Sequence, residues 1–288
     1  MYAITGATGH VGGAAARELL AHGEPVRAII RTAAKAETWT QAGAQIALAD
    51  FADRAALAAA FRGCRAAFVM LPTDPTFPDP DAGHRHLADS IAGAVADSGV
   101  PYVVMLSSIG AELPDGTGPI RWLHHLETQL RRTGVTLTAI RAPHFQEKVE
   151  TLLDTARDLG IYPVFADSAD HPIPMVATRD IGTTVAAALT TSSPADDILA
   201  LDPPHYTERQ VAKELSALLG KPLEVLPIPQ SDWTTLLIDS GLSPALAAEL
   251  TALYTAEQAG LLHPTGNRHV PCPTELHDTL RTLVHPIL

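Results

Sequence analysis

The first half of the chain alternates short apolar runs with longer segments in which apolar residues recur at helical spacing. Short runs rich in β-branched residues predict buried strands, and apolar residues three and four positions apart predict helices. Strands are predicted over 2–4, 25–31, 45–50, 66–71, 102–107 and 136–141, and helices over 14–20, 54–61, 81–98 and 123–132. This order is typical of right-handed strand-helix-strand units. We therefore expect an α/β fold with a Rossmann-type, doubly wound parallel sheet.

A glycine-rich turn connects the first predicted strand to the first predicted helix. The segment Thr5-Gly6-Ala7-Thr8-Gly9-His10-Val11-Gly12 has the spacing G-x-x-G-x-x-G. The first glycine permits a tight turn, the second lets the backbone approach a pyrophosphate, and the third lets the helix pack on the strand. The helix N-terminus adds unpaired N–H groups and a positive dipole end. We predict that a dinucleotide contacts Gly6, Thr8, Gly9, His10, Val11 and Gly12.

The pattern loosens after about Lys148. Proline-rich joints at 202–204 and 226–229 separate short helical segments, among them 208–219 and 244–254. We expect 1–148 to form the cofactor-binding Rossmann domain, with later strands returning to its sheet near 174–201. Residues 149–288 are expected to form a smaller, mainly helical, substrate-binding portion over the carboxyl edge of the sheet, where Rossmann-type folds bind ligands.

Composition and charge exclude several classes of protein. The chain has 288 residues, 46% of them hydrophobic, and a formal net charge of −12. An acidic balance argues against a nucleic-acid partner or an anionic membrane surface. Because no secretory signal or long apolar stretch is evident, we expect a cytoplasmic monomer or homodimer acting on a small molecule. Cys64 and Cys272 are isolated, and histidines such as His84 and His86 lack the spacing of a metal site, so no metal is expected.

The end of the second predicted strand bears on the choice of cofactor. An acidic residue there favours NAD, whereas basic residues favour the 2′-phosphate of NADP. Here Arg31 is followed by Lys35, which predicts NADP(H), although a solvated basic pair is the alternative. Asp50-Phe51 is expected near the adenine, or else Asp50 caps the helix that begins near Arg54. Leu71-Pro72 is expected beneath the ribose and the nicotinamide.

Several motifs resemble the NmrA-like branch of the atypical short-chain dehydrogenases/reductases, which includes type 2 quinone oxidoreductases. They comprise the opening glycine turn, the Arg31 and Lys35 pair, 106–110, 127–147, 173–182 and 206–212. The segment 138–147 is similar to that family's T-x-x-R-P-x-x-F-x-E-N pattern. The resemblance implies binding of NADP(H) or NAD(H). Some members reduce quinones or other electrophiles and others are redox sensors. The resemblance therefore supports the predicted fold and cofactor more strongly than it supports a particular reaction.

The catalytic residues are less evident than the cofactor loop. The chain contains no Tyr-x-x-x-Lys, the pair with which classical short-chain dehydrogenases protonate a carbonyl oxygen. Related NmrA-like enzymes often keep a lysine four residues before a helical glutamate. With Glu127 as that glutamate, the position is occupied by Leu123.

Two residues near the expected nicotinamide are the catalytic candidates, Ser107 and His124. His124 is preferred over its neighbour His125, although both also fit a surface or packing role. Ser107 fits either a contact to nicotinamide or substrate, or a helix cap.

Residues after the sixth predicted strand are expected on the substrate side. His144, Phe145 and Gln146 are the substrate-binding candidates, and Phe145 also fits a place in the core. Glu147 fits a structural role, in which it pairs with a helix end.

These observations predict an NADP(H)-dependent oxidoreductase that reduces a small quinone-like or conjugated carbonyl compound by hydride transfer. Such acceptors form a stabilised anion, so a weak proton donor suffices. One alternative is a non-catalytic NADP(H) redox sensor of the NmrA type. Another is a biosynthetic enzyme that uses bound cofactor for a step without net redox change.

Overall fold

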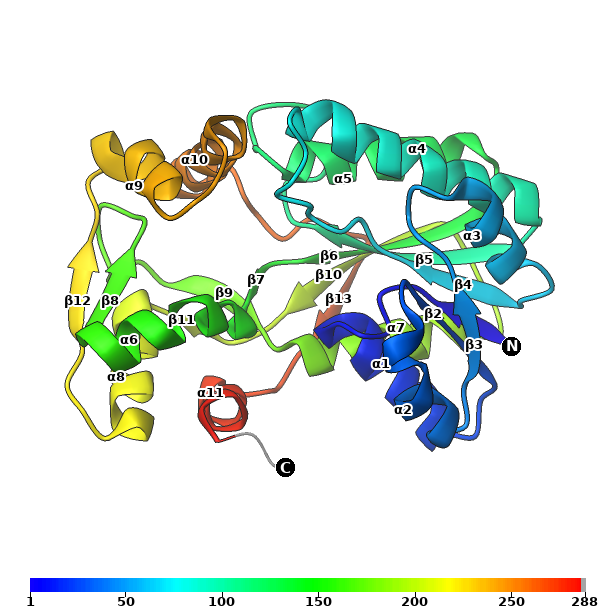
Figure 1. Ribbon diagram of the computed structural model, residues 1–288, viewed down its shortest axis with the longest axis horizontal. Coiled ribbons are helices and arrows are strands. Elements are labelled where there is room, and N and C mark those ends of the chain that lie inside the picture. The colour runs from blue at the N-terminus through cyan, green and yellow to red at the C-terminus, as the bar shows by residue number, and fades with distance from the viewer. Residues whose placement is uncertain (286–288) are drawn as a thin grey trace.

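A computed structural model describes residues 1–285, and its centre is a parallel sheet with eight strands among those residues (Figure 1). The strand order is β13-β10-β6-β5-β4-β1-β2-β3, and every neighbouring pair runs parallel. The first six strands therefore have the 3-2-1-4-5-6 order of a Rossmann sheet. The strands are β1 (Tyr2–Ile4), β2 (Val26–Ile30), β3 (Gln45–Leu48), β4 (Ala66–Val69), β5 (Tyr102–Ser108), β6 (Thr136–Ala142), β10 (Asp197–Asp202) and β13 (Arg268–Pro271).

Helices cover both faces of this sheet, as the nearly continuous apolar strands require. On one face, α1 (His10–Ala21) and α7 (Thr178–Leu189) pack against each other and on the central strands. On the opposite face lie α3 (Arg54–Phe61), α4 (Pro80–Ser98) and α5 (Ile120–Arg132). The short η1 (Ala33–Lys35) and α2 (Ala36–Gln41) connect β2 to β3, and Trp39 of α2 enters the core.

A smaller layer lies beyond the carboxyl ends of the strands (Figure 1). It has its own apolar core, which gathers side chains from residues 149–284. Two small sheets contribute to it: β7 (His144–Phe145) with β9 (Ile173–Val176) and β11 (His205–Tyr206), and β8 (Ile161–Val164) with β12 (Glu224–Pro227). Its helical elements are η2 (Gln146–Leu152), α6 (Leu153–Leu159), α8 (Glu208–Leu219), η3 (Gln230–Asp232), α9 (Trp233–Asp239), α10 (Pro244–Gln258) and α11 (Leu276–Val284).

Local sequence explains where several helices begin. The Asp53 side chain accepts a hydrogen bond from the Ala56 N–H and caps α3, and Asp79 caps α4 in the same way ahead of Pro80. Thr207 and Gln210 form a reciprocal capping box at the start of α8. Each cap satisfies N–H groups that have no partner within the helix.

The predicted fold class is confirmed, but the two parts of the chain are interleaved. Strand β10 returns to the main sheet within the expected 174–201 region, whereas β9 pairs in a small sheet. Strand β13 also joins the main sheet and α7 packs on α1, neither of which was expected. Residues 149–285 therefore also contribute to the main sheet, because β10 and β13 form its edge beyond β6. Among residues 1–285, no helix combines the length and hydrophobicity that a membrane crossing requires.

Candidate functional site

The glycine turn between β1 and α1 has the geometry of a dinucleotide loop. Gly6 adopts a φ of +62°, a left-handed conformation that favours glycine. A Cβ on Gly12 would lie 2.4 Å from the Gly6 carbonyl oxygen and 2.6 Å from that of Thr5. Both obstacles are backbone atoms that cannot move aside, so only glycine allows α1 to start this close to β1. The glycine spacing therefore has a structural reason at both positions.

The first turn of α1 is available to an anion. Gly9 is the N-cap, and no side chain caps the helix within the described residues. The first N–H groups of α1 therefore have no intrahelical or side-chain partner, which is the arrangement that binds phosphate. Thr8 and His10 are exposed beside this turn, while the Val11 side chain is buried and only its backbone can reach a ligand. The His10 Nε2 lies 2.9 Å from the Glu150 Oε2, which connects the loop to η2.

Two basic residues follow β2 at the carboxyl edge. Arg31 and Lys35 are exposed, and neither side chain forms a hydrogen bond or an ion pair with any other residue of 1–285. Thr32 is extended, with φ −132° and ψ 143°, so Arg31 lies outside the short helical segment that contains Lys35. Arg31 faces the segment after β4, where it adds to the Thr76 hydrogen bonds that lower the pKa of Asp74. Both cations are thus free to bind a phosphate.

The remaining predicted cofactor residues lie on neighbouring strand ends. Asp50 is exposed, and one of its oxygens accepts the Ala52 N–H at 2.9 Å. The alternative that Asp50 caps α3 is wrong, because Asp53 holds that position. Phe51 is half-buried against the core beneath α3. Leu71-Pro72 is half-buried directly after β4.

Ser107, one of the two catalytic candidates, belongs to a buried ionic network. Its Oγ donates to the Glu127 Oε1 at 2.6 Å. The same carboxylate accepts hydrogen bonds from Arg141, Nε at 3.2 Å and Nη2 at 3.1 Å, and pairs with Arg131 at 2.9 Å. Burial favours a raised pKa for Glu127, but the hydrogen bonds from Arg141 and Ser107 outweigh it and lower that pKa. Because its proton is committed to Glu127, Ser107 can offer a ligand only oxygen lone pairs.

His124, the other catalytic candidate, lies in the second turn of α5. Its Nδ1 is 2.9 Å from the Ala111 carbonyl oxygen, so Nδ1 carries the proton in the neutral ring and Nε2 carries a lone pair. Neutral His124 can therefore accept a proton at Nε2 but cannot donate one there. Its neighbour His125 contacts Asp89 at 2.8 Å, on the outer side of the helix. Leu123 packs on the apolar core and leaves this helix without an ammonium group toward the site.

The three predicted substrate residues have different environments. His144 is half-buried, has no hydrogen-bond partner within residues 1–285, and burial together with nearby Lys148 lowers its pKa to about 3. Phe145 is half-buried against the core that α1 and α7 share. Gln146 is buried, and its amide is used internally: its Nε2 donates to the carbonyls of Met175 and Thr274 at 3.0 Å each. Gln146 thus supports the wall of the site rather than offering its amide to a ligand.

Glu147 has the structural role that sequence reasoning allowed. Its carboxylate accepts two hydrogen bonds from the Thr178 N–H, at 2.9 and 3.0 Å, and one from the Thr178 hydroxyl at 2.6 Å. It therefore binds the N-terminus of α7. Burial raises the pKa of Glu147 despite these bonds.

Sequence reasoning missed a charged cluster beside His144. It contains Lys148 of η2, Glu208 of α8 and Glu257 of α10, with Tyr162 of β8 donating to the Glu208 Oε2 at 2.7 Å. Nothing in the local pattern links these residues, because they are up to 109 positions apart (257 − 148) and lie on four different elements. The scarcity of lysine in the chain was the only available signal.

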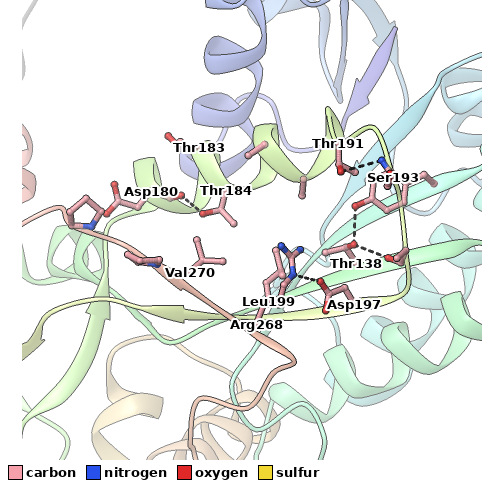
Figure 2. Close-up of a pocket in the computed structure, with 16 residues that line it drawn as sticks. Thr138, Asp180, Thr183, Thr184, Thr191, Ser193, Asp197, Leu199, Arg268 and Val270 are labelled. Carbon is pink, nitrogen blue, oxygen red and sulfur yellow. Dashed lines mark hydrogen bonds and ion pairs between the residues drawn. The ribbon is translucent and has the colours of Figure 1, made fainter.

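A groove of about 460 Å³ lies elsewhere, between α7 and the strands β10 and β13 (Figure 2). Its walls include Tyr102, Thr138, Asp197 and Arg268, which stand at or near the starts of their strands. Ligands of Rossmann-type sheets bind at the opposite, carboxyl ends. We therefore place the candidate active site at the glycine turn and not in this groove.

Together, the strand order and the glycine turn at the N-terminus of α1 define a dinucleotide-binding Rossmann protein. The residues fit a pyridine dinucleotide: the free N–H groups of α1, the glycines of the turn and two cations without a side-chain partner among residues 1–285 lie along one sheet edge.

Comparison with known proteins agrees with this class. A family model described as NAD(P)H-binding matches residues 6–192, more than half of the chain. The chain is 33% identical over 225 residues to a (4-alkanoyl-5-oxo-2,5-dihydrofuran-3-yl)methyl phosphate reductase from Streptomyces griseus, across 77% of this chain and 75% of the relative. It is 26% identical over 256 residues to an NAD(P)H azoreductase from Xenophilus azovorans, across 88% and 86% respectively.

A solved structure extends the comparison to the fold. The NADPH-dependent quinone oxidoreductase from Escherichia coli, in complex with NADPH, matches with a TM-score of 0.74 at 22% identity, over 98% of this chain and 99% of that one. The family model and the Streptomyces relative together show that the chain belongs to the NAD(P)H-binding family.

Proposed function

We propose that this chain is an NADPH-dependent reductase of small electrophilic acceptors, either quinones or conjugated carbonyl compounds. One observation carries the choice of cofactor: Arg31 and Lys35 are exposed and unpaired within residues 1–285 at the end of β2. A 2′-phosphate at this position would receive charge-assisted hydrogen bonds from both cations, whereas NADH would leave them without a partner.

Each part of the proposed site has a separate task. The free N–H groups at the start of α1 bind the pyrophosphate, and Asp50 can accept from the adenine amino group. Leu71-Pro72 borders the ribose and nicotinamide. When bound, NADPH supplies two electrons and one proton as a hydride. His144 and Phe145 border the acceptor, and the largely desolvated ring of His144 disfavours a cationic form at that wall.

The proposed class of acceptor follows from the lack of a strong proton donor among the candidate catalytic residues. The Ser107 proton is held by Glu127, Leu123 replaces a possible lysine, and neutral His124 has no proton on Nε2. A simple ketone needs a strong donor because its reduction forms an unstabilised alkoxide. A quinone or a conjugated carbonyl forms a delocalised anion and is reduced with weaker assistance. The reductase names of the relatives from Streptomyces and Xenophilus are consistent with electron-poor, conjugated acceptors.

The proposal is tested by following NADPH oxidation with a panel of quinones, enones and simple ketones, and by repeating the panel with NADH. We expect turnover with the first two classes, little with ketones, and a lower KM for NADPH than for NADH. Tight NADPH binding without turnover on any acceptor would contradict a reductase. That result would favour the redox-sensor alternative, for which the missing lysine at Leu123 is the supporting observation.

A further inference from the structure

Residues 70–79 connect β4 to α4 without regular secondary structure, and we call them the 70–79 segment. At the start of this segment, Met70 lies against the glycine turn, since a Cβ on Gly6 would be only 2.6 Å from the Met70 Sδ. Leu71-Pro72 comes next and is half-buried. The proposed function places Leu71-Pro72 beside the ribose and the nicotinamide. Whatever fixes this segment therefore also fixes one wall of the proposed cofactor site.

A buried histidine of α4, His84, holds the middle of the segment. Its Nε2 accepts a hydrogen bond from the Asp74 N–H at 3.0 Å, and its Nδ1 lies 2.5 Å from the Pro80 carbonyl oxygen. A backbone N–H can only donate and a carbonyl oxygen can only accept, so the ring is neutral and carries its proton on Nδ1. Burial supports this state, because it lowers the pKa of His84 against the attraction of Asp74, Asp81 and Glu249.

Aromatic packing fixes the orientation of the His84 ring. Phe77 of the segment meets the ring edge-on, with centroids 5.2 Å apart, and Trp122 of α5 stacks on it at 3.9 Å and 5°. Trp122 is itself held, since its Nε1 donates to the Asp81 Oδ1 at 3.0 Å. A Cβ on Gly83 would lie 2.4 Å from the Phe77 ring, so glycine is needed for Phe77 to pack on α4. The His84 ring is thus enclosed between the segment and α5.

The hydrogen bond to His84 attaches an otherwise weakly connected stretch of backbone. Within residues 1–285, the Asp74 N–H is the one group of residues 72–78 that hydrogen-bonds to another element. The remaining hydrogen bonds of this stretch are internal: the Thr76 N–H and hydroxyl donate to the Asp74 Oδ1 at 2.9 and 2.6 Å. Irregular backbone with few external bonds keeps conformational freedom that a ligand must remove when it binds. His84 therefore sets how much of this freedom remains.

We propose that His84 is a positioning residue for the cofactor, because its neutral, Nδ1-protonated ring holds the 70–79 segment, and with it Leu71-Pro72, in the conformation that borders the nicotinamide. This inference rests on the proposed function. Without an acceptor at the Nε2 position, the Asp74 N–H loses its partner and NADPH must order the segment as it binds. One hydrogen bond contributes little net free energy, so we expect NADPH binding to weaken by about 3- to 10-fold.

The first test needs neither cofactor nor turnover. In NMR of protein labelled with 15N-histidine, the His84 ring is assigned as the one lost in His84→Gln. We expect a proton on Nδ1 and none on Nε2 at neutral pH. We also expect the Asp74 amide to exchange with solvent at least about 10-fold faster in His84→Phe than in wild type. A proton on Nε2, or equal exchange in the two proteins, would overturn the proposal.

The second test separates the hydrogen bonds from the packing by three substitutions of His84. His84→Gln can place its amide oxygen near the Nε2 position and keep the acceptor for the Asp74 N–H, whereas His84→Asn keeps only a donor near the Nδ1 position. His84→Phe keeps an aromatic ring without either group. We expect the NADPH Kd, measured by calorimetry, to rise about 3- to 10-fold in His84→Asn and His84→Phe and to stay within about twofold of wild type in His84→Gln. Equal effects of all three substitutions would overturn the proposal.

Steady-state kinetics distinguish positioning from a loss of folded protein. With a quinone acceptor, His84→Phe should raise the KM for NADPH and leave the KM for the quinone within about twofold. A merely structural role would lower the amount of active enzyme, and therefore the apparent kcat, without a selective change in the KM for NADPH. A change in kcat alone would thus overturn the proposal.

A third test reaches the segment without altering His84. Gly83→Ala would push the Phe77 ring away from α4, whereas Gly93→Ala, in the same helix, would meet only the guanidinium of Arg54, whose side chain is 54% exposed and can move aside. We expect weaker NADPH binding in Gly83→Ala and wild-type binding in Gly93→Ala. Wild-type binding in both variants would overturn the role of the docked segment.

The proposed function and the role of His84 can fail separately. A protein that binds NADPH but oxidises it with no acceptor would refute the reductase. The NADPH affinities of the variants, the ring tautomer and the Asp74 exchange rate would then still test the role of His84.

Discussion

The buried ionic network around Glu127 should decide much of the stability of the carboxyl edge. The perturbation is Glu127→Gln, which preserves shape and removes the charge. Only 2% of the Glu127 side chain and 6% of the Arg141 side chain are exposed, so water cannot replace the lost carboxylate. Among residues 1–285, Arg141 would keep one carboxylate partner, Glu112, whose side chain is 34% exposed and whose Oε2 lies 2.9 Å from Nη1, together with a hydrogen bond from Nη1 to the Thr265 hydroxyl.

The expected magnitude follows from this burial. Removing one partner of a buried ion pair costs about 3–5 kcal/mol, because the other charge stays buried without compensation. With a shift of roughly 2–4 °C per kcal/mol for a domain of this size, Tm should fall by about 6–20 °C. The pKa of Glu127 is lower in the folded protein than in the unfolded chain. Its ionised carboxylate therefore stabilises the fold at pH values above the unfolded pKa, and this stabilisation is lost as the pH falls through the folded pKa. The stability difference between wild type and variant should therefore shrink in acid.

Urea unfolding and thermal melts of wild type, Glu127→Gln and Glu112→Gln would measure these effects. Glu112→Gln is the matched control, and removing this partly exposed partner should cost about 1 kcal/mol or less. The double variant Glu127→Gln/Arg141→Gln should recover part of the loss, since it leaves no unpaired charge. A melting temperature for Glu127→Gln within about 2 °C of wild type would refute the reasoning.

Three further outcomes are expected. Replacing Arg31 and Lys35 by alanine should raise the KM for NADPH by about 10- to 100-fold and leave that for NADH within about twofold, because only NADPH carries the 2′-phosphate; equal changes for both would exclude phosphate recognition. Gly12→Ala should lower the free energy of unfolding by about 1–3 kcal/mol and weaken NADPH binding measured by calorimetry, because the new Cβ would lie 2.4 Å from the Gly6 carbonyl oxygen. Unchanged NADPH binding would show that α1 can shift away from this contact. His144, with a folded pKa of about 3, should show no imidazole titration by NMR between about pH 5 and 8, and a titration near 6.5 would refute its burial. As pH falls below about 6.5, the unfolded wild-type chain binds a proton at His144 that the folded protein does not bind, so wild type should lose more stability than His144→Gln.

Sequence patterns were most informative where one segment carries its own signal. The helix over 54–61 and the helix over 208–219 have the predicted bounds, because a capping residue and an apolar period mark each of them locally. The bounds of α1 were less accurate, since its first turn is a ligand-binding end that follows glycine and lacks a side-chain cap. The glycine turn itself needs no tertiary information, because only glycine satisfies its backbone geometry.

The candidate catalytic residues show the opposite case. Ser107 and His124 were chosen because strand ends and the next helix face the cofactor in this fold. Only the structure reveals that Glu127 holds the Ser107 proton and that the Ala111 carbonyl sets the His124 tautomer. A serine or a histidine looks the same in the sequence whether its hydrogen-bonding groups are available to a ligand or already bound to another residue.

The sequence by itself determined the alternation of strands and helices, the glycine turn and the basic end of β2, because periodicity, backbone freedom and charge are local properties. Only the tertiary structure decided which later segments rejoin the sheet and which polar groups are already satisfied. Those features depend on contacts between residues far apart in the chain. Burial and mutual electrostatics, which change what a side chain can do, exist only once these contacts have formed.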